Sequence, residues 1–292
     1  MMITPTIIHQ YWQALWQQYR QRVKYAQIYE EMIIQTGGRL SNDHIAFRSL
    51  GMEIETPHGK INLGIPYLEK IIQSWGYEFG GEYLFPHTHL YARHYYHPQQ
   101  EEFNLPKLFL SELRVGELPD NIRQLIQQTV IAVDTLPTDN LDILKIFNRP
   151  WQPPYYSVVQ TINQVSQYAA WVLIHGYAVN HFTGYINQQN TPTYPDIDAT
   201  AAGLSQLGVP MKAEIEGNIH LGLRQTATHA VTEMVTVIDD ITQKEIQVPW
   251  TYAYYELAQR YMIENSSGNP VLFDGFLGKN AQELFEMTRV TE

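Results

Sequence analysis

The first part of the chain has apolar residues at helical spacing. Between about residues 5 and 36 they recur every three or four positions, as Ile8, Trp12 and Tyr19 illustrate. This period predicts one or two amphipathic helices. The sequence Thr-Gly-Gly at 36–38 favours a turn and ends the helical pattern.

Residues 39–117 alternate between strand and helix patterns. The segment NDHIAFRSLG has the period of a strand. A helix is expected over IPYLEKIIQSWG, where Gly76 ends it. Two segments rich in β-formers, YLFPHTHLYARHYYH and KLFLSELRVGEL, predict further strands.

Residues 118–170 predict a helical linker. Helices are expected in PDNIRQLIQQTV and in NLDILKIF, and the proline-rich turn RPWQPP follows them. A long helical pattern, YSVVQTINQVSQYAAWVLIHG, then leads into the second half of the chain.

The second half repeats the order of the first. YAVNHFTGYI predicts a strand, and DIDATAAGLSQLG predicts a helix with Asp196 or Asp198 near its N-cap and Gly208 at its end. Four segments that follow predict successive strands: AEIEG, IHLGLRQTAT, VTEMVTVID and WTYAYYELAQRY. The last residues predict a mostly irregular tail.

The two halves also carry matching polar residues. Each opens with a strand in which an acidic or amide residue precedes a histidine, His44 or His181, and each closes with a strand that contains Glu112 or Glu256 before leucine. Such a repeat predicts an α+β fold of paired βαβββ modules, whose strands form an open barrel-like sheet around a metal cavity, with added helices. We expect N-terminal helices at 1–38, a first module at 39–117, the helical linker at 118–170, a second module at 171–265 and the C-terminal tail at 266–292.

Composition narrows the possible chemistry. The chain has no cysteine, which excludes thiolate metal sites and cysteine nucleophiles. Its net charge is −11 and its basic residues do not cluster, so we expect no nucleic-acid partner and no docking to an anionic membrane. No apolar run reaches the roughly 20 residues of a membrane span, and the start lacks a signal-peptide pattern. We therefore expect a cytoplasmic protein.

Two histidines and a carboxylate at repeat-related positions suggest a metal site. If His44, His181 and Glu256 share one metal ion, three positions of an octahedral Fe(II) stay open for a bidentate 2-oxoacid and dioxygen. Zinc, nickel and manganese accept the same ligands. The alternative for His44 is a half-buried strand histidine held by a hydrogen bond, and the alternative for Glu256 is an exposed strand residue.

Arg48 follows His44 by four residues. On a strand this even spacing puts both side chains on one face, so Arg48 would bind a substrate carboxylate beside the metal. The alternative is a surface salt bridge. Arg224 is a weaker candidate for the same role.

Three further residues leave their roles open. Glu112, in the first half, could be a fourth metal ligand, a residue that supports the ligands, or a remnant of the repeat. His87 and His89 lie two residues apart and would share one face of a strand. We favour a packing or supporting role for these two histidines, because the second half has no matching pair.

At these residues the chain resembles a known family. The motifs DHIAFRSL, VNHFT followed by DID, MKAEIEG, LRQT and YYELAQR occur in this order between about residues 40 and 262. In order and spacing they are similar to the 2-oxoadipate dioxygenase/decarboxylase family, also called hydroxyglutarate synthase. The last motif also resembles the metal-binding strand of 4-hydroxyphenylpyruvate dioxygenase.

The resemblance implies a vicinal-oxygen-chelate fold and a non-haem Fe(II). Carried over by position, it implies that His44, His181 and Glu256 are the metal ligands and that Arg48 is the catalytic, substrate-binding residue that holds the distal carboxylate. The implied reaction is the oxidative decarboxylation of a 2-oxodicarboxylic acid with O2, in which 2-oxoadipate gives 2-hydroxyglutarate and CO2.

Two alternatives stay open at this point. One is a glyoxalase-like zinc or nickel lyase or isomerase, with Glu112 as a fourth ligand. The other is a metal-binding module without catalysis. The metal, the acid and the oligomeric state are likewise open.

Overall fold

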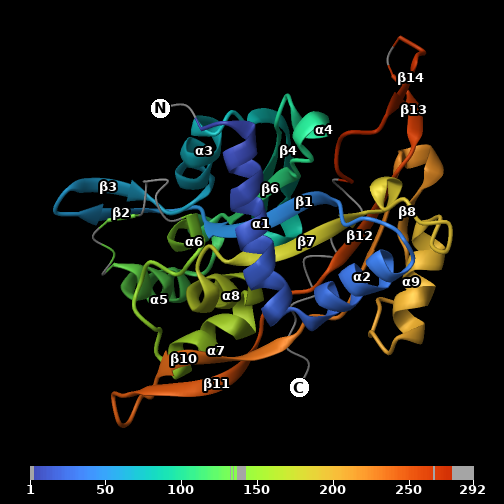
Figure 1. The fold of residues 1–292 in the computed structure, drawn as a ribbon. Coiled ribbons are helices and arrows are strands. Elements are labelled where there is room, and N and C mark those ends of the chain that lie inside the picture. Colours follow the sequence, from blue (N-terminus) through green and yellow to red (C-terminus); the bar gives the residue numbers. More distant parts are fainter. Residues whose placement is uncertain (1–2, 132, 134, 137–142, 266, 278–292) are drawn as a thin grey trace.

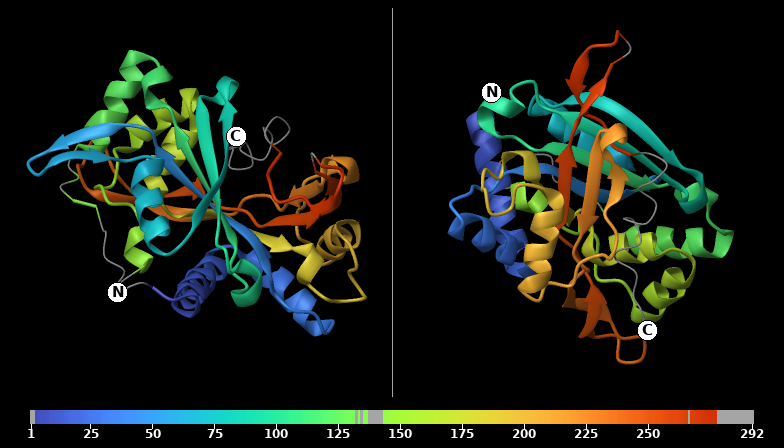
Figure 2. Two further views of the ribbon diagram at one scale, coloured as in Figure 1. Left: turned by 90° about the horizontal axis from the view of Figure 1, so that it is seen from above. Right: turned by 90° about the vertical axis from the view of Figure 1, so that its right-hand side faces the viewer.

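The computed structural model describes residues 3–131, 133, 135–136, 143–265 and 267–277. Within these residues, eight strands form one curled sheet in the order β4-β5-β6-β1-β7-β12-β9-β8 (Figures 1 and 2). The strands are β1 (Asn42–Leu50), β4 (Glu78–Phe85), β5 (Leu90–Tyr96), β6 (Lys107–Leu113), β7 (Val179–Tyr185), β8 (Glu216–Asn218), β9 (Leu223–Ala227) and β12 (Glu256–Arg260).

The sheet consists of two modules of the same topology. The first runs β1, α3 (Ile65–Ser74), β4, β5 and β6; the second runs β7, α9 (Ile197–Gln206), β8, β9 and β12. The antiparallel pairing of β1 with β7 joins the modules at the centre of the sheet. The predicted fold of paired βαβββ modules is therefore confirmed, whereas the boundaries of the five expected segments stay a prediction.

The strand register relates the modules by a local two-fold axis. Across β1 and β7, His44 is opposite Thr183 and Ala46 is opposite His181, so the two histidines are equivalent. In the parallel pairs, Glu256 of β12 is opposite Thr183, and Phe109 of β6 is opposite Ala46.

The structural counterpart of Glu256 is therefore Phe109. The expectation that Glu112 is the counterpart of Glu256 is therefore wrong, because Glu112 lies three residues after Phe109 on β6. An odd shift of this kind also turns a strand side chain to the other face of the sheet. The sequence pattern was misleading because both β6 and β12 contain Glu-Leu, but the two pairs lie at different positions in the strand register.

One face of the central strands is covered by α1 (Pro5–Arg22). Thr4 caps this helix by accepting a hydrogen bond from the backbone N–H of Ile7, as expected for an N-cap threonine. Its apolar stripe packs on the sheet: Trp16 lies 5.1 Å from Phe182, between ring centroids. Burying such a side chain contributes about 1.5–3 kcal/mol. Because alternate residues of a strand face opposite ways, His181 faces away from α1.

The remaining helices and hairpins surround this sheet. Helix α2 (Lys24–Gln35) follows α1, and Figure 1 shows both on one side of the central strands. The other described elements are α4 (Gln100–Phe103), α5 (Asp120–Val130), α6 (Ile143–Ile146), α7 (Tyr156–Val165), α8 (Gln167–His175), β2 (Glu53–Thr56), β3 (Gly59–Asn62), β10 (Thr232–Ile238), β11 (Glu245–Thr251), β13 (Met262–Glu264) and β14 (Pro270–Leu272). No helix in the described part of the chain is long and apolar enough to cross a membrane.

Two expected strands differ in the structure. VTEMVTVID belongs to β10, which pairs with β11 in a separate hairpin inserted between β9 and β12. The segment WTYAYYELAQRY is not one strand, because residues 252–255 leave the ladder. Two of their carbonyls accept from side chains instead: the Trp171 indole donates to Tyr252 O and the Tyr19 hydroxyl donates to Tyr254 O.

The long expected helix of the linker is also divided. It breaks at Ser166, whose backbone is extended and whose hydroxyl accepts a hydrogen bond from the N–H of Ala169. Serine favours such a cap over a helix interior because its side chain competes for backbone hydrogen bonds. The break lets α8 turn toward the sheet.

Candidate metal centre

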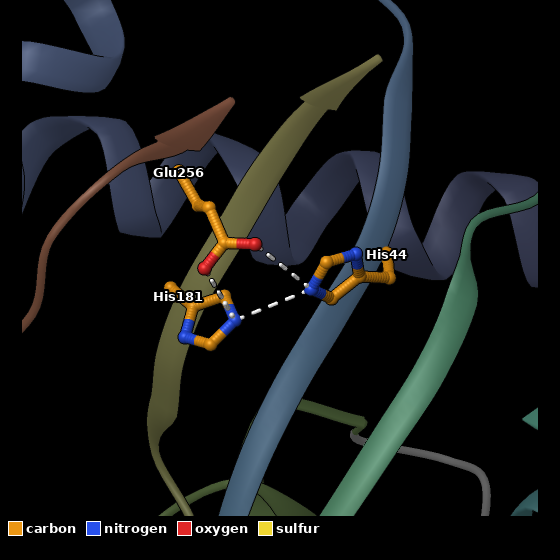
Figure 3. Close-up of side chains that lie close together, drawn as sticks. All are labelled: His44, His181 and Glu256. Carbon is orange, nitrogen blue, oxygen red and sulfur yellow. Dashed lines mark hydrogen bonds and ion pairs between the residues drawn. The ribbon is translucent and has the colours of Figure 1, made fainter. Parts of the chain in front are cut away.

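The three residues singled out as ligands lie together on adjacent strands. His44 is on β1, His181 is on β7 and Glu256 is the first residue of β12 (Figure 3). The two Nε2 atoms are 3.3 Å apart, and each lies 3.6 Å from a different oxygen of Glu256. All three side chains are buried. The alternatives of an exposed Glu256 and an isolated strand histidine therefore do not hold.

Neighbouring residues fix the orientation of both imidazoles. Asp43 Oδ1 lies 2.8 Å from Nδ1 of His44, and Asn180 Oδ1 lies 3.0 Å from Nδ1 of His181. Each oxygen accepts a hydrogen bond from Nδ1–H, so each Nε2 keeps a lone pair that points into the site. The hydroxyl of Thr183 also lies 3.0 Å from Nε2 of His44.

Burial determines the charge state of these groups. It lowers the pKa of His44 although Asp43 acts in the opposite sense, and it lowers the pKa of His181 well below its usual value. Both imidazoles are therefore neutral donors at neutral pH. Burial, together with the charge of Asp43, raises the pKa of Glu256 well above its usual value. A cation would compensate the desolvation of this carboxylate.

The donor set fits a divalent metal ion. Ligand atoms about 2.1 Å from a metal lie roughly 3.0–3.4 Å apart when the angles between them are 90–109°, and the distances here are 3.3–3.6 Å. Among the described residues, His44, His181 and Glu256 form a group whose ligand atoms all lie within 4.8 Å of one another. Two imidazoles and a carboxylate suit iron, manganese, nickel or zinc.

Arg48 lies in the same pocket, as its spacing from His44 predicts. Its side chain is buried, and its guanidinium lies 4.9 Å from the ring centroid of Tyr168 and 5.1 Å from that of Trp171. Both rings belong to α8. Burial lowers the pKa of Arg48, but arginine stays charged in proteins. Arg48 therefore does not form the surface salt bridge considered as the alternative.

The pocket also contains residues that the sequence did not single out. Tyr254 stacks on the ring of His181 at 4.8 Å, and burial raises the pKa of its phenol well above the usual value. Gln225 of β9 adds an amide. An apolar wall is formed by Phe85, Phe109, Phe276 and Leu277, among others. The tail gave no periodic signal, so Phe276 could not be found from the pattern.

Other sequence candidates lie outside the group. Glu112 accepts a hydrogen bond from the N–H of Ile65 at 2.8 Å, at the start of α3. His87 and His89 lie in or next to a short turn between β4 and β5, not on a strand, and His89 pairs with Glu117 at 3.0 Å.

Arg224, the weaker carboxylate-binding candidate, has a partner outside the pocket. It forms a bidentate pair with Asp198, whose side chain is exposed. We therefore assign it no part in the site.

The paired modules and the buried group between them define a vicinal-oxygen-chelate protein with a candidate metal centre. The family model for 2-oxoadipate dioxygenase/decarboxylase matches residues 11–290. The chain belongs to this family and is an enzyme of this kind, so the resemblance seen in its motifs is confirmed.

Relatives and solved structures agree with this assignment. The chain is 27% identical to the chloroplastic/amyloplastic 2-oxoadipate dioxygenase/decarboxylase of Oryza sativa subsp. japonica, over 86% of this chain and 70% of the relative. The structure of hydroxyglutarate synthase from Oryza sativa in complex with 2-oxoadipate has a TM-score of 0.80 at 23% identity, over 97% of this chain and 92% of the other. A proposed glyoxalase superfamily protein from Ralstonia eutropha JMP134 has a TM-score of 0.78 at 21% identity, over 94% and 87% of the two chains. At these identities the two structures support the fold.

Proposed function

We propose that this enzyme is an Fe(II)-dependent dioxygenase/decarboxylase that converts a 2-oxodicarboxylic acid of the 2-oxoadipate type, with O2, to a 2-hydroxy acid and CO2. The observation that carries the proposal is the buried group of His44, His181 and Glu256 in the same pocket as the guanidinium of Arg48. Membership of the family supplies the reaction class.

Each end of the substrate has a different partner in this proposal. His44, His181 and Glu256 would hold the metal on one side and leave the other side open. The 2-oxoacid end of the substrate would chelate the metal through its two oxygens, and Fe(II) there would supply the redox chemistry with dioxygen. Arg48 would bind the distal carboxylate through charge-assisted hydrogen bonds. Two fixed ends hold the substrate in one orientation, which is how binding energy contributes to rate.

The walls of the pocket have a separate task. Phe85, Phe109 and Phe276 are apolar, and they would pack on the methylene chain of the substrate and exclude water from it. The phenol of Tyr254, beside His181, stays protonated because burial raises its pKa. It is therefore a hydrogen-bond donor and not an additional anion in the pocket.

The direct test is an aerobic assay of the Fe(II)-loaded protein against matched 2-oxoacids. 2-Oxoadipate should cause equal uptake of O2 and release of CO2, whereas 2-oxohexanoate, which has the same number of carbons but no distal carboxylate, should react far more slowly. Turnover of 2-oxohexanoate at the rate of 2-oxoadipate would contradict the role of Arg48. No O2 uptake with any 2-oxoacid would contradict the proposed reaction.

The glyoxalase-like alternative has lost its expected fourth ligand, because Glu112 bonds to the start of α3. It differs from the proposal in one measurable way, since a lyase or isomerase consumes no O2.

A cytoplasmic location is also part of the proposal. The composition, free of cysteine, is compatible with a reducing compartment.

A further inference from the structure

A buried ion pair lies directly behind His44. Asp43 accepts a hydrogen bond from Nδ1 of His44, and its two oxygens also accept bonds from Nε and Nη2 of Arg260 at 2.6 and 2.8 Å. Both charged side chains are 1% exposed. Burial opposes the ionisation of Asp43, but the guanidinium of Arg260 outweighs it and holds the pKa of Asp43 well below its usual value.

The two histidines differ in this respect. The residue equivalent to Asp43 in the second module is Asn180, a neutral amide. A carboxylate behind a histidine orients the ring and makes it a more basic ligand than an amide does. The local two-fold symmetry therefore ends at this position, and His44 alone has a charged partner behind its ring.

Arg260 also reaches a segment of the tail. Its remaining nitrogen, Nη1, donates to the carbonyl oxygens of Phe273 and Gly275 at 3.0 and 2.8 Å. We call residues 273–277 the strap. Two further contacts hold it: Lys107 pairs with Asp274 at 2.6 Å, and the N–H of Phe276 donates to the hydroxyl of Tyr83 at 3.1 Å.

The strap places an aromatic ring against the candidate metal centre. The ring of Phe276 meets the ring of His44 edge to face, with 4.8 Å between centroids. The guanidinium of Arg260 lies 5.4 Å from the centroid of the same Phe276 ring. One arginine thus contacts the partner of His44, the backbone of the strap and the ring that the strap inserts beside His44.

We propose that Arg260 is a positioning residue that couples the orientation of His44, through Asp43, to the closure of the strap over the site. This inference rests on the proposed function, in which His44 is a metal ligand. The fork of the guanidinium suits this role because its donors point in fixed directions, so a shift of Asp43 moves the bonds to Phe273 and Gly275.

Coupling between two sites is reciprocal. If metal binding at His44 fixes Asp43 and Arg260, it must also favour the closed strap, and a closed strap must favour metal binding by the same factor. An ion pair that only stabilises the fold would give no such link, because it would hold the strap equally with and without metal.

The test is amide hydrogen exchange of the strap in the metal-free and the Mn²⁺-loaded protein. Two of its amides have partners that report closure: Phe273 N–H donates to Tyr261 O, and Phe276 N–H donates to Tyr83. In the wild-type protein Mn²⁺ should slow their exchange about tenfold, a factor typical of coupled sites. The affinity for Mn²⁺ is measured on the same samples by calorimetry.

The variant must not leave a buried charge unpaired, since that alone could unfold the protein. The double variant Asp43→Asn with Arg260→Gln removes both charges and puts neutral amides in their place. We expect it to fold, to bind Mn²⁺ about tenfold more weakly, and to show less than about a twofold response of strap exchange at saturating metal. The control is Arg123→Gln, which breaks an exposed arginine–carboxylate pair on α5, outside the site, and should respond as the wild type does.

The outcomes separate this inference from the proposed function. If wild-type protein binds Mn²⁺ at His44 and His181 but strap exchange does not change, the coupling is wrong and the metal site stands. A full strap response in the double variant would also overturn the role of Arg260. If the wild-type protein binds no metal at all, the proposed function and this inference fall together.

Discussion

At the scale of single residues, burial places two charged groups, Arg48 and Glu256, in one pocket. Arg48 is 1% exposed and Glu256 is 2% exposed, so neither side chain faces bulk solvent. A charge that is removed from water needs a partner that compensates its lost hydration. In the proposed complex a metal ion compensates Glu256, and the distal carboxylate of the substrate binds Arg48.

Replacing Arg48 should change substrate affinity and leave the metal in place. In Arg48→Gln the charge is lost and a shorter, neutral amide remains, so KM for 2-oxoadipate should rise about 10–100-fold, the equivalent of roughly 1.5–3 kcal/mol for a hydrogen bond to a charged group. Steady-state kinetics and metal analysis measure both effects. Any turnover of 2-oxohexanoate should keep its KM; an equal loss for both acids would show that Arg48 does not recognise the distal carboxylate.

Replacing Glu112 tests whether it takes part in metal binding. Its carboxylate accepts a hydrogen bond from the first residue of α3, where a negative charge also favours the helix dipole. Burial opposes this effect, since it raises the pKa of Glu112. Glu112→Gln keeps an oxygen for the N–H of Ile65 and should therefore change the free energy of unfolding by less than about 1 kcal/mol, as measured by urea titration, and leave Zn²⁺ affinity unchanged. A clear loss of Zn²⁺ affinity would return Glu112 to the set of ligands.

At the scale of elements, helix α8 packs against the part of the pocket that contains Arg48. Its aromatic residues Tyr168 and Trp171 contact the guanidinium, and its last residue, His175, bonds to Thr251 O at 3.0 Å. The helix thus connects the Arg48 end of the pocket to the hairpin formed by β10 and β11. Burial, with smaller effects from Arg22, Arg149 and Arg48, lowers the pKa of His175 to about 3.

This low pKa makes the element sensitive to acid. The unfolded chain binds a proton at His175 below a pKa of about 6.5, while the folded chain stays neutral down to about 3. Stability from this group is therefore complete above pH 6.5 and falls as the pH decreases toward 3. Between pH 7 and pH 5 the loss should be about 2 kcal/mol.

The matched variant is His175→Gln, which keeps an N–H for Thr251 O and cannot titrate. Urea unfolding of the metal-free proteins at pH 7 and pH 5 measures the difference. The variant should lose about 2 kcal/mol less than the wild type over this interval. Identical losses in the two proteins would mean that His175 does not titrate as its burial implies.

At the scale of the whole molecule, the two modules present nearly symmetric positions to one cavity. The register sets Phe109 where the second module has Glu256. The fold therefore offers four positions around the cavity. His44, His181 and Glu256 occupy three of them, and the aromatic residue Phe109 occupies the fourth. Phe109 contributes to the apolar wall of the pocket, and as an aromatic residue it would leave a bound metal with the two histidines and one carboxylate as its protein ligands.

Placing a glutamate at position 109 would make the two modules symmetric. We expect it to raise the affinity for metal and to lower the catalytic rate. In Phe109→Glu a second carboxylate would face the ion as a fourth ligand, so the affinity for Zn²⁺ should rise while O2-dependent turnover falls. Without metal the buried carboxylate should lower the free energy of unfolding by at least about 2 kcal/mol. Thermal unfolding with Zn²⁺ and with a chelator measures this, and Phe109→Gln is the control. If Zn²⁺ stabilises the two variants equally, the fourth position does not face the metal.

Much of this architecture could be predicted from the sequence, because strand and helix periods are local. His44 and His181 were recognised since each follows a similar residue in a similar strand. Strand pairing is not local, and it decides which residues face each other; for that reason Glu112 was matched in place of Phe109. The strap could not be predicted either, because Phe276 lies in an irregular tail that is held by contacts with distant residues.

The proposed function requires that His44, His181 and Glu256 bind one metal ion. The most direct measurement is anomalous X-ray diffraction from crystals of the protein loaded with Zn²⁺. We predict one peak in this pocket, about 2.0–2.2 Å from the two Nε2 atoms and from a carboxylate oxygen of Glu256. An empty pocket, or a peak elsewhere such as near His87 and His89, would contradict the account.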